Sequence, residues 1–307
     1  MLKIERLKKE ILDSGLFDSE FYLTAYPEVK KESIDPIIHY LMIGVQKFYN
    51  PSKNFDTKFY LEKNPDVKKI KMNPLIHYIR FGKKEGRLPL PAVKIGVGII
   101  TTGSRKLKDY RLEKETEFYV YIDKERKGPA YGRNQCLLNL LARGCTHIFL
   151  FDDDCYPVMG GWEKVFVEEA QKASIDFINL PEYFKDKMID YPNAPIQYWN
   201  GGDAQFLYLT KHAVDTLGAF NEGYGRYGFD GIAYIYRAQQ AGLCGKFEGV
   251  PFPIRGIAYI HAEDVYGENP SVITTSAEKE VFIKKNIPIF DAEKANARRG
   301  KWFIPFK

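Results

Sequence analysis

Residues 146–154 read Thr-His-Ile-Phe-Leu-Phe-Asp-Asp-Asp, an apolar run that ends in three consecutive carboxylates. A continuous apolar run of this length is typical of a strand buried on both faces of a parallel sheet. Open α/β sheets bind their ligands at the carboxyl ends of the strands. We therefore expect Asp152, Asp153 and Asp154 to lie at a ligand-binding edge, with an acidic surface turn as the plainer alternative.

The spacing of these carboxylates predicts how they are used. Side chains alternate along an extended strand, so Asp152 and Asp154 should point one way and Asp153 the other. Adjacent anions repel one another unless a cation or hydrogen-bond donors compensate them. Carboxylate oxygens are hard ligands that favour Mg²⁺ or Mn²⁺, and such ions usually bind together with substrate phosphates. The stretch thus predicts a divalent-metal site.

The composition indicates a globular protein without special compositional bias. The chain has 307 residues, of which 45% are hydrophobic and 28% charged, and its formal charge of +5 is too small to indicate nucleic-acid binding by itself. The four cysteines include no Cys-x-x-Cys pair, which argues against a zinc site or a disulfide framework. No secretory signal and no run of eighteen apolar residues is found, so we expect a cytoplasmic protein without a transmembrane segment, with peripheral membrane association left open.

The first ninety residues contain an internal repeat. Phe17 recurs as Phe55 and His39 as His77, each pair separated by 38 residues. A fixed period of this length indicates a repeated supersecondary unit. We interpret the two histidines as packing residues at equivalent positions rather than as metal ligands.

Each repeat is expected to form two short helices, with an acidic cap on the first, a proline at the start of the second and a glycine at its end. These residues are Asp18, Pro36 and Gly44 in the first repeat and Asp56, Pro74 and Gly82 in the second.

The pattern changes after the proline-rich stretch 88–91, and strands then alternate with helices. The expected elements are strands at 93–100, 117–122, 146–151 and 257–260 and helices at 131–142, 232–241 and 276–285. Such alternation predicts an α/β fold with a mostly parallel, doubly wound sheet flanked by helices. We divide the chain into an all-α repeat domain (1–90), an α/β domain (91–275) and a carboxyl-terminal helix with a basic and aromatic tail (276–307), which we expect to be loosely packed.

The order of short motifs between residues 93 and 264 resembles that of GT-A fold nucleotide-sugar glycosyltransferases, close to family 2 and family 7-like enzymes. The matching motifs are Thr101-Thr102, Asp123, Ala130-Tyr131-Gly132-Arg133-Asn134, Asp152-Asp153-Asp154, Gly201-Gly202, Ala219-Phe220-Asn221-Glu222, Phe229-Asp230 and His261. The repeats resemble modules found beside bacterial polysaccharide glycosyltransferases, where docking of a protein and holding of a glycan are both open roles.

The resemblance implies a metal site and a donor site. Asp154 would bind Mn²⁺ or Mg²⁺ directly, Asp152 would contact the ribose or the waters of the ion, and His261 would complete the metal shell. Glu263 and Asp264 are alternatives to His261, and His261 as an ordinary turn residue also stays open. The residues implied to bind the nucleotide-sugar are Thr101, Thr102, Arg105, Asp123, Arg133, Asn134, Asp152, Asp153, Gly201 and Gly202.

Two of these residues have specific expected partners. Asp123, after the second strand, would accept a hydrogen bond from the N3–H of uracil, unless it is a plain turn residue. Arg133 offers a planar, permanently charged donor fork to a diphosphate or base edge, unless it is an ordinary surface arginine.

The resemblance also implies the catalytic and acceptor residues. Asp230 would be the general base on the acceptor hydroxyl, with helix capping as the alternative, and Phe229 stands where the family usually has a first acid. Trp199, Asp203 and Phe229 would contact the acceptor, although Trp199 is alternatively a core residue. The glycine-rich segment 220–228 is expected to be mobile and to close over the donor.

These observations predict a metal-dependent, inverting glycosyltransferase that moves a sugar from a nucleotide-sugar donor to a hydroxyl of a surface polysaccharide. The favoured donor is a UDP-sugar. One alternative acceptor is a modified base in DNA. Another reading is a catalytically silent protein that binds sugar nucleotides or carbohydrate. A metal-dependent phosphatase or nuclease is disfavoured because it has no use for the Arg-Asn helix start.

Overall fold

The computed structural model describes residues 2–181, 187–263 and 275–307. The chain divides into two compact units, Met1–Ala92 and Val93–Lys307. Within the described residues, no helix combines the length and the apolar composition that crossing a membrane requires.

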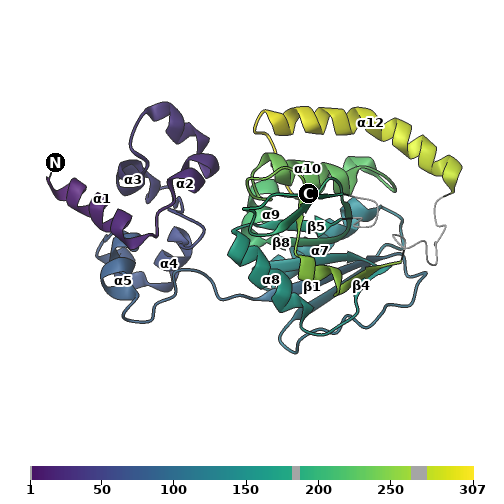
Figure 1. Ribbon diagram of the computed structural model, residues 1–307, viewed down its shortest axis with the longest axis horizontal. Coiled ribbons are helices and arrows are strands. Elements are labelled where there is room, and N and C mark those ends of the chain that lie inside the picture. The colour runs from purple at the N-terminus through teal and green to yellow at the C-terminus, as the bar shows by residue number, and fades with distance from the viewer. Residues whose placement is uncertain (1, 182–186, 264–274) are drawn as a thin grey trace. The chain divides into compact units, whose positions relative to one another are not determined.

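The regular elements described in the first unit are helices (Figure 1). A leading helix, α1 (Leu2–Ser14), precedes two repeats of matching element order. The first repeat comprises α2 (Ser19–Ala25), η1 (Pro27–Glu32), α3 (Pro36–His39) and η2 (Tyr40–Gly44). The second comprises α4 (Thr57–Lys63), α5 (Pro65–Lys69), α6 (Pro74–His77) and η3 (Tyr78–Gly82).

The predicted helix starts are confirmed in both repeats. The Asp18 carboxylate accepts a hydrogen bond from the Phe21 N–H at 2.9 Å, and Asp56 does the same for Phe59 at 2.8 Å. Pro36 and Pro74 occupy the first turns of α3 and α6, where the missing N–H costs nothing.

The two histidines pack inside their repeats, as predicted. The Tyr22 hydroxyl lies 2.9 Å from His39 Nδ1, and the Tyr60 hydroxyl lies 2.9 Å from His77 Nδ1. Both imidazoles are buried, and burial lowers the pKa of His77 below its ordinary value. The repeat is therefore built around a tyrosine–histidine pair.

The two glycines end their helical segments as predicted, but not by forming a left-handed helix cap. Gly44 and Gly82 end the π-helical segments η2 and η3, but neither adopts the left-handed conformation of a helix cap. A Cβ at Gly44 would overlap the Tyr22 hydroxyl, and one at Gly82 would overlap the Tyr60 hydroxyl. The glycines are needed because they leave room for the tyrosine of each tyrosine–histidine pair.

The second unit is built on a five-stranded sheet in the order β2-β1-β3-β8-β5. Its strands are β1 (Ile95–Thr101), β2 (Glu117–Ile122), β3 (His147–Asp152), β5 (Phe177–Leu180) and β8 (Asp203–Thr210). β1 pairs in parallel with β2 and β3, while β8 runs antiparallel to both β3 and β5. The predicted mostly parallel sheet is confirmed, with β8 as the exception.

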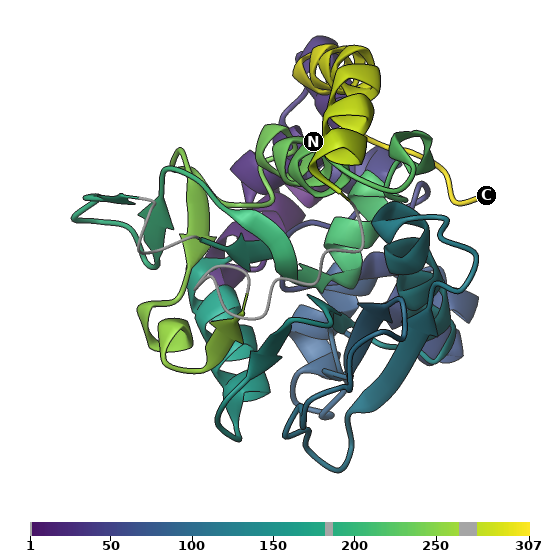
Figure 2. The same cartoon turned by 90° about the vertical axis from the view of Figure 1, so that its right-hand side faces the viewer.

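Helices flank this sheet, and two small sheets accompany it. The helices are α7 (Pro129–Ala142), α8 (Trp162–Ala173), α9 (Lys211–Leu217), η4 (Glu222–Tyr224), α10 (Asp230–Gln240), α11 (Ile254–Ile257) and α12 (Ser276–Arg298). β4 (Cys155–Pro157) pairs with β10 (Ile260–Ala262), and β6 (Met188–Ile189), β7 (Gln197–Trp199) and β9 (Val250–Phe252) form a sheet to one side (Figure 2).

The strand expected at 257–260 is displaced. Ile257 ends the short helix α11, and the strand β10 begins only at Ile260. An apolar run this short does not distinguish a helical turn from a strand. Only the residues from Ile260 onward pair with β4, so the strand begins there.

The expectation of a loosely packed carboxyl-terminal tail is wrong. α12 lies alongside α10 (Figure 1), and the chain beyond it returns to the body, where the Ala219 N–H donates to the Ile304 carbonyl at 2.7 Å. The buried Arg237 guanidinium donates to the Trp302 carbonyl at 2.7 Å and ion-pairs with Glu293 at 2.8 Å. The tail supplies acceptors to a buried cation, which the local sequence does not reveal.

The substitution Gly44→Ala should destabilise the first unit, because the new methyl group displaces the Tyr22 hydroxyl from its histidine. Overpacking of this kind costs about 1–3 kcal/mol, measured as the loss in free energy of unfolding by denaturant titration. Gly160→Ala is the control, since nothing lies within 4 Å of its added Cβ. Equal stability of the two variants would contradict the tyrosine–glycine fit.

Candidate functional site

The acidic stretch lies at the carboxyl edge of the parallel strands. β3 ends at Asp152, which is level with Ile100 near the end of the neighbouring strand β1. Asp153 and Asp154 follow in the turn that leads to β4. The three carboxylates therefore share one edge with Thr101, the last residue of β1.

The expected alternation of the three carboxylates is not observed. Asp152 binds Arg133, whereas Asp153 and Asp154 both bind Arg105, at 3.2 Å and 2.7 Å. The Thr101 hydroxyl also donates to Asp153. Alternation fails because the strand stops at Asp152, and a turn does not keep the two-residue period of an extended chain.

Arg133 on α7 is the centre of the buried part of the site. Its guanidinium donates to Asp230 at 2.6 Å, to Asp152 at 2.7 Å and to the Ala204 carbonyl at 3.1 Å. The residue is only 3% exposed. In this arrangement Arg133 does not present its fork to a diphosphate, as was expected, because two carboxylates of the protein already occupy that fork.

Asp230 is consequently not free to act as the predicted general base, because it is buried and paired with Arg133. It is the first residue of α10, is 6% exposed and holds Arg133. It does not cap the helix either, since the capping position is Phe229, which makes no side-chain cap. In this arrangement Asp230 is a positioning residue for Arg133.

Phe229 and Asp203 lie around this pair. Phe229 has a left-handed backbone with φ 71° and stacks on Phe290 with ring centroids 4.9 Å apart, so part of its face is covered by α12. Asp203 begins β8 and accepts hydrogen bonds from the Ala204 and Gln205 N–H groups. Neither arrangement shows an acceptor surface.

Asp154 has a carboxylate oxygen that no protein group satisfies. One carboxylate oxygen binds Arg105 at 2.7 Å, while Oδ1 is buried and has no hydrogen-bond partner. Burial raises the pKa of this carboxyl above its ordinary value, against the opposing effect of Arg105. A buried, unsatisfied carboxylate oxygen is costly unless a cation or donor reaches it.

The proposed additional metal ligands lie on the small sheet beside Asp154. The Glu263 N–H donates to the Asp154 carbonyl at 2.9 Å, and the Glu263 carboxylate binds Lys108 at 2.6 Å. His261 pairs with Tyr156 across the β4–β10 ladder, with ring centroids 5.3 Å apart. Asp264 lies outside the described residues.

The donor set fits a hard divalent cation that also binds phosphate. Among residues 2–181, 187–263 and 275–307, no three His, Cys, Asp or Glu side chains already converge around one point. Mg²⁺-like ions in nucleotide sites commonly use one or two carboxylates and take their other ligands from phosphates and water. The unsatisfied Asp154 Oδ1 provides such a ligand, so the residues fit the ion with Asp154 as its main anchor.

The edge is strongly acidic. Five carboxyl groups, those of Asp152, Asp153, Asp154, Asp203 and Asp230, lie at this edge with only two guanidinium groups, those of Arg105 and Arg133. Burial raises the pKa of Asp152 to about 8; Arg133 opposes this effect, and the nearby carboxylates reinforce it. Because the Asp152 side chain is still 30% exposed, it is the member of the buried group closest to solvent.

Two residues predicted to bind the nucleotide instead bind backbone. Asp123 is buried and accepts the N–H groups of Lys127 and Gly128 at 2.8 Å and 2.7 Å, which is the turn role left open above. Asn134 donates to the Phe220 carbonyl at 3.0 Å and accepts its N–H at 2.7 Å. Both side chains fix loops rather than face a ligand.

The remaining predicted contacts divide between core and surface. Trp199 is 3% exposed and packs near Phe252, so it is a core residue and is not available to stack on a sugar. A Cβ at Gly202 would overlap the Asn179 amide, so this glycine serves a close protein contact; Gly201 precedes it in the same loop. Thr102 is part-buried and its hydroxyl lies 2.9 Å from that of Ser104.

The glycine-rich segment 220–228 is tied down rather than free. The buried Asn286 amide on α12 donates to the Tyr224 and Tyr227 carbonyls, each at 2.8 Å. Glu293 accepts hydrogen bonds from Asn221 at 3.0 Å and from the Tyr224 hydroxyl at 2.9 Å. In this conformation α12 therefore holds the segment that leads to Phe229 and Asp230.

Sequence reasoning missed Asn286, Glu293 and a basic cavity. The cavity, of about 590 Å³, is lined by Lys106, Leu107, Lys108 and Asp109, directly after Arg105. Two signals were available in the sequence. One is Asn286, an uncharged polar residue beside Ile287 in the predicted carboxyl-terminal helix region, and the other is the cationic run that follows β1.

No protein-family model matches the chain, and no curated protein matches it. Among solved structures, it is similar to "A197 from STIV", with a TM-score of 0.28, 15% identity and coverage of 40% of this chain and 68% of that one. It is also similar to "a glycosyltransferase involved in the glycosylation of the major capsid of PBCV-1", with a TM-score of 0.27, 12% identity and coverage of 47% and 67%. TM-scores this low carry no argument about the fold or the function of this chain.

The substitution Asn286→Ala should loosen segment 221–229 by removing the donors that hold its carbonyls. Amide hydrogen exchange in that segment is expected to accelerate about tenfold or more, as the loss of buried hydrogen bonds implies. Asn296→Ala on the exposed side of the same helix is the matched control. Equal exchange in the two variants would show that α12 does not hold the segment.

The raised pKa of Asp152 predicts how stability depends on pH. Between about pH 4 and about pH 8 the folded protein retains a proton that the unfolded chain has lost, so the free energy of unfolding should fall as the pH rises through this range. Asp152→Asn should remove this part of the dependence, measured by urea unfolding in EDTA. The control is Asp215→Asn, at a surface ion pair. Parallel pH curves for wild type and Asp152→Asn would contradict the raised pKa.

Proposed function

We propose that this chain is a metal-dependent glycosyltransferase that uses a nucleotide-sugar donor, with a UDP-sugar as the favoured donor. The observation that supports it most directly is the unsatisfied Asp154 Oδ1 at an acidic sheet edge, next to Arg105 and the basic cavity. The order of motifs in the sequence supports the same reaction class. The polysaccharide acceptor is part of the proposal.

Asp154 would hold the ion, with His261 on the neighbouring strand β10 and Glu263 directly after that strand as candidate further ligands. The ion, when bound, supplies Lewis-acid stabilisation of the charge that develops on the departing diphosphate. Arg105 would share Asp154 with the ion, and it is the more exposed of the two guanidinium groups at this edge, at 12% against 4% for Arg133, so it would be the one to meet a phosphate.

Transfer is proposed as a single displacement at the anomeric carbon. The acceptor oxygen forms the new bond to that carbon while the bond to the diphosphate oxygen breaks, and the acceptor proton passes to a carboxylate. Asp152, with its side chain 30% exposed, is better placed to receive the proton than Asp230, at 8%. The raised pKa of Asp152, about 8, means that it does so only after it has lost its own proton. Asp230 acts by holding Arg133.

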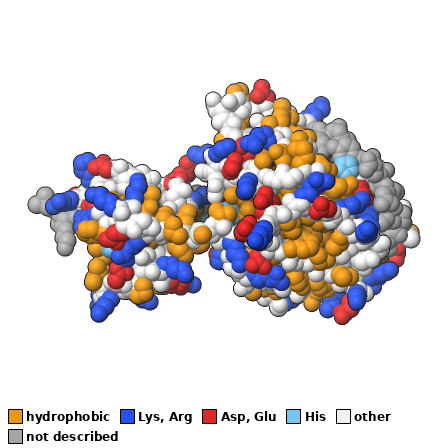
Figure 3. Space-filling view, turned by 90° about the horizontal axis from the view of Figure 1, so that it is seen from below, with side chains coloured by type: hydrophobic (Ala, Val, Ile, Leu, Met, Phe, Trp, Pro, Cys, Tyr) orange, Lys and Arg blue, Asp and Glu red, His pale blue; other side chains and the backbone are white. Residues whose placement is uncertain are grey.

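A sugar-nucleotide binding protein without turnover is the second candidate. The specific observation in its favour is the ion pair between Asp230 and Arg133, which occupies the expected base. Transfer to a modified DNA base has less support. On the face drawn in Figure 3, positive and negative side chains are interspersed, so that face offers no broad basic surface for a phosphate backbone.

Asp154→Asn tests the metal-dependent proposal. Calorimetric titration of wild type with Mn²⁺ and UDP should show binding that needs both, and donor turnover should fall about a hundredfold or more in the variant, as loss of several kcal/mol of charge stabilisation implies. Asp215→Asn should behave as wild type. Metal-dependent UDP binding without donor turnover would select the silent binding protein, and full turnover in EDTA would rule out the mechanism.

A further inference from the structure

The leading helix α1 is pinned to both repeats of the first unit. Lys8 ion-pairs with Asp35 of the first repeat at 2.7 Å. Glu10 receives two hydrogen bonds from Arg80 of the second repeat, one from Nε and one from Nη2, each at 2.8 Å. The parallel two-bond geometry holds the Arg80 guanidinium in a defined plane.

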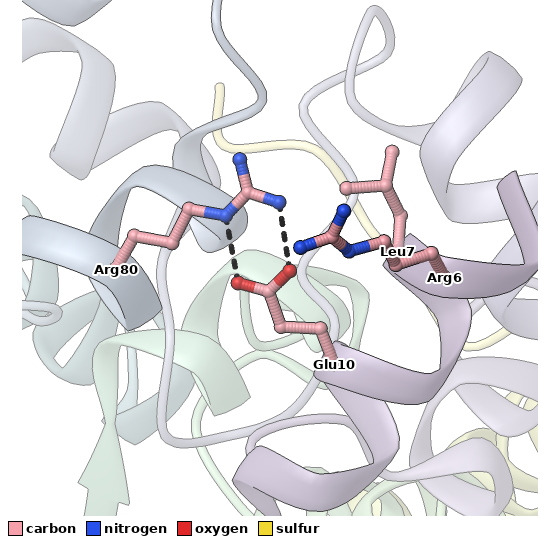
Figure 4. A pocket seen from close by; sticks show the side chains of 4 residues that line it. All are labelled: Arg6, Leu7, Glu10 and Arg80. Carbon is pink, nitrogen blue, oxygen red and sulfur yellow. Dashed lines mark hydrogen bonds and ion pairs between the residues drawn. The ribbon is translucent and has the colours of Figure 1, made fainter. Parts of the chain in front are cut away.

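A second arginine approaches the same carboxylate. Arg6 lies one turn before Glu10 on α1, and Figure 4 shows its guanidinium beside Glu10 and turned toward that of Arg80. Together with Leu7 these side chains line a cavity of about 450 Å³, a size within the usual range for small-ligand sites. The walls are thus two cations, one anion and one apolar side chain.

The charges in this cavity do not balance. Glu10 offsets one guanidinium, which leaves a formal excess of one positive charge. Among the described residues, Arg6 makes no hydrogen bond or ion pair, and Arg80 uses only two of its five N–H donors on Glu10. Several charged N–H donors of the two arginines that line the cavity therefore have no acceptor among the described residues.

The repeat architecture does not require these arginines. The position equivalent to Arg80 in the first repeat is Met42, which is 58% exposed, whereas the tyrosine–histidine pair and its glycine are the same in both repeats. The frame of the repeat is thus complete without Arg80. The arginine adds a feature confined to the second repeat and α1.

We infer that this cavity binds the carboxylate of an acidic sugar unit in a glycan chain. Arg6 and Arg80 would hold the carboxylate through their free N–H donors, and Leu7 would contact the apolar face of the sugar ring. One excess charge beside an apolar wall suits a single anionic sugar better than a nucleic acid, whose binding grows with the number of phosphates neutralised. That this glycan is the acceptor rests on the proposed function; the binding itself does not.

The test uses the full chain and acidic oligosaccharides of galacturonic acid, with neutral glucose oligomers, inorganic phosphate and duplex DNA as comparison ligands. Arg6→Ala should weaken binding of the acidic oligomers about tenfold or more, the loss expected for hydrogen bonds between charged partners. Lys9→Ala is the matched control, since it removes the same charge from the exposed neighbouring position of α1 and should leave binding unchanged.

Glu10→Gln separates a binding site from a structural ion pair. It raises the excess charge of the cavity while its amide oxygen still accepts a hydrogen bond from Arg80, so acidic oligomers should bind severalfold tighter. A purely structural role predicts lower thermal stability and no gain in affinity.

Three results would overturn the inference: equal losses in Arg6→Ala and Lys9→Ala, no gain in Glu10→Gln, or neutral oligomers, phosphate or DNA binding as tightly as the acidic sugars. UDP and Mn²⁺ titrations of the same variants should match wild type. They distinguish failure at this cavity from failure of the donor site.

Discussion

The buried guanidinium of Arg133 is the interaction on which the candidate site depends. It joins the end of β3, through Asp152, to the start of α10, through Asp230, and it also binds the backbone of β8. Removing one partner of such a buried pair leaves an uncompensated charge and costs about 3–5 kcal/mol. The same bonds that stabilise this edge also decide which carboxylates remain available to a ligand.

This constraint divides the acidic edge into two parts. Asp152 and Asp230 are committed to Arg133, whereas Asp153 and Asp154 meet the more peripheral Arg105. The unsatisfied oxygen lies in the second part, on Asp154. The buried part therefore positions the edge and contains Asp152, the proposed proton acceptor. The part around Arg105 is where a cation and a phosphate would be accommodated.

The carboxyl-terminal helix α12 fixes the segment that leads to Asp230, the partner of Arg133. Asn286 and Glu293 hold the segment before Phe229, and Arg237 ties Glu293 to the returning tail. The first unit is organised differently, because the same tyrosine–histidine–glycine set occurs at equivalent positions in both repeats and forms most of their frame. Its singular features, Arg6 and Arg80, lie outside that set.

The sequence by itself determined the features that depend on short-range physics. Periodicity and caps predicted the repeat, the helix starts at Asp18 and Pro36, a buried strand directly before the acidic stretch and the mostly parallel sheet. Only the tertiary structure decided the partners of the polar side chains. Arg133 and Asp230 are 97 residues apart, and Asn286 and Tyr224 are 62 apart. No local pattern encodes a pairing over such separations, because the desolvation that makes these bonds necessary arises only when the helices and sheet close around them.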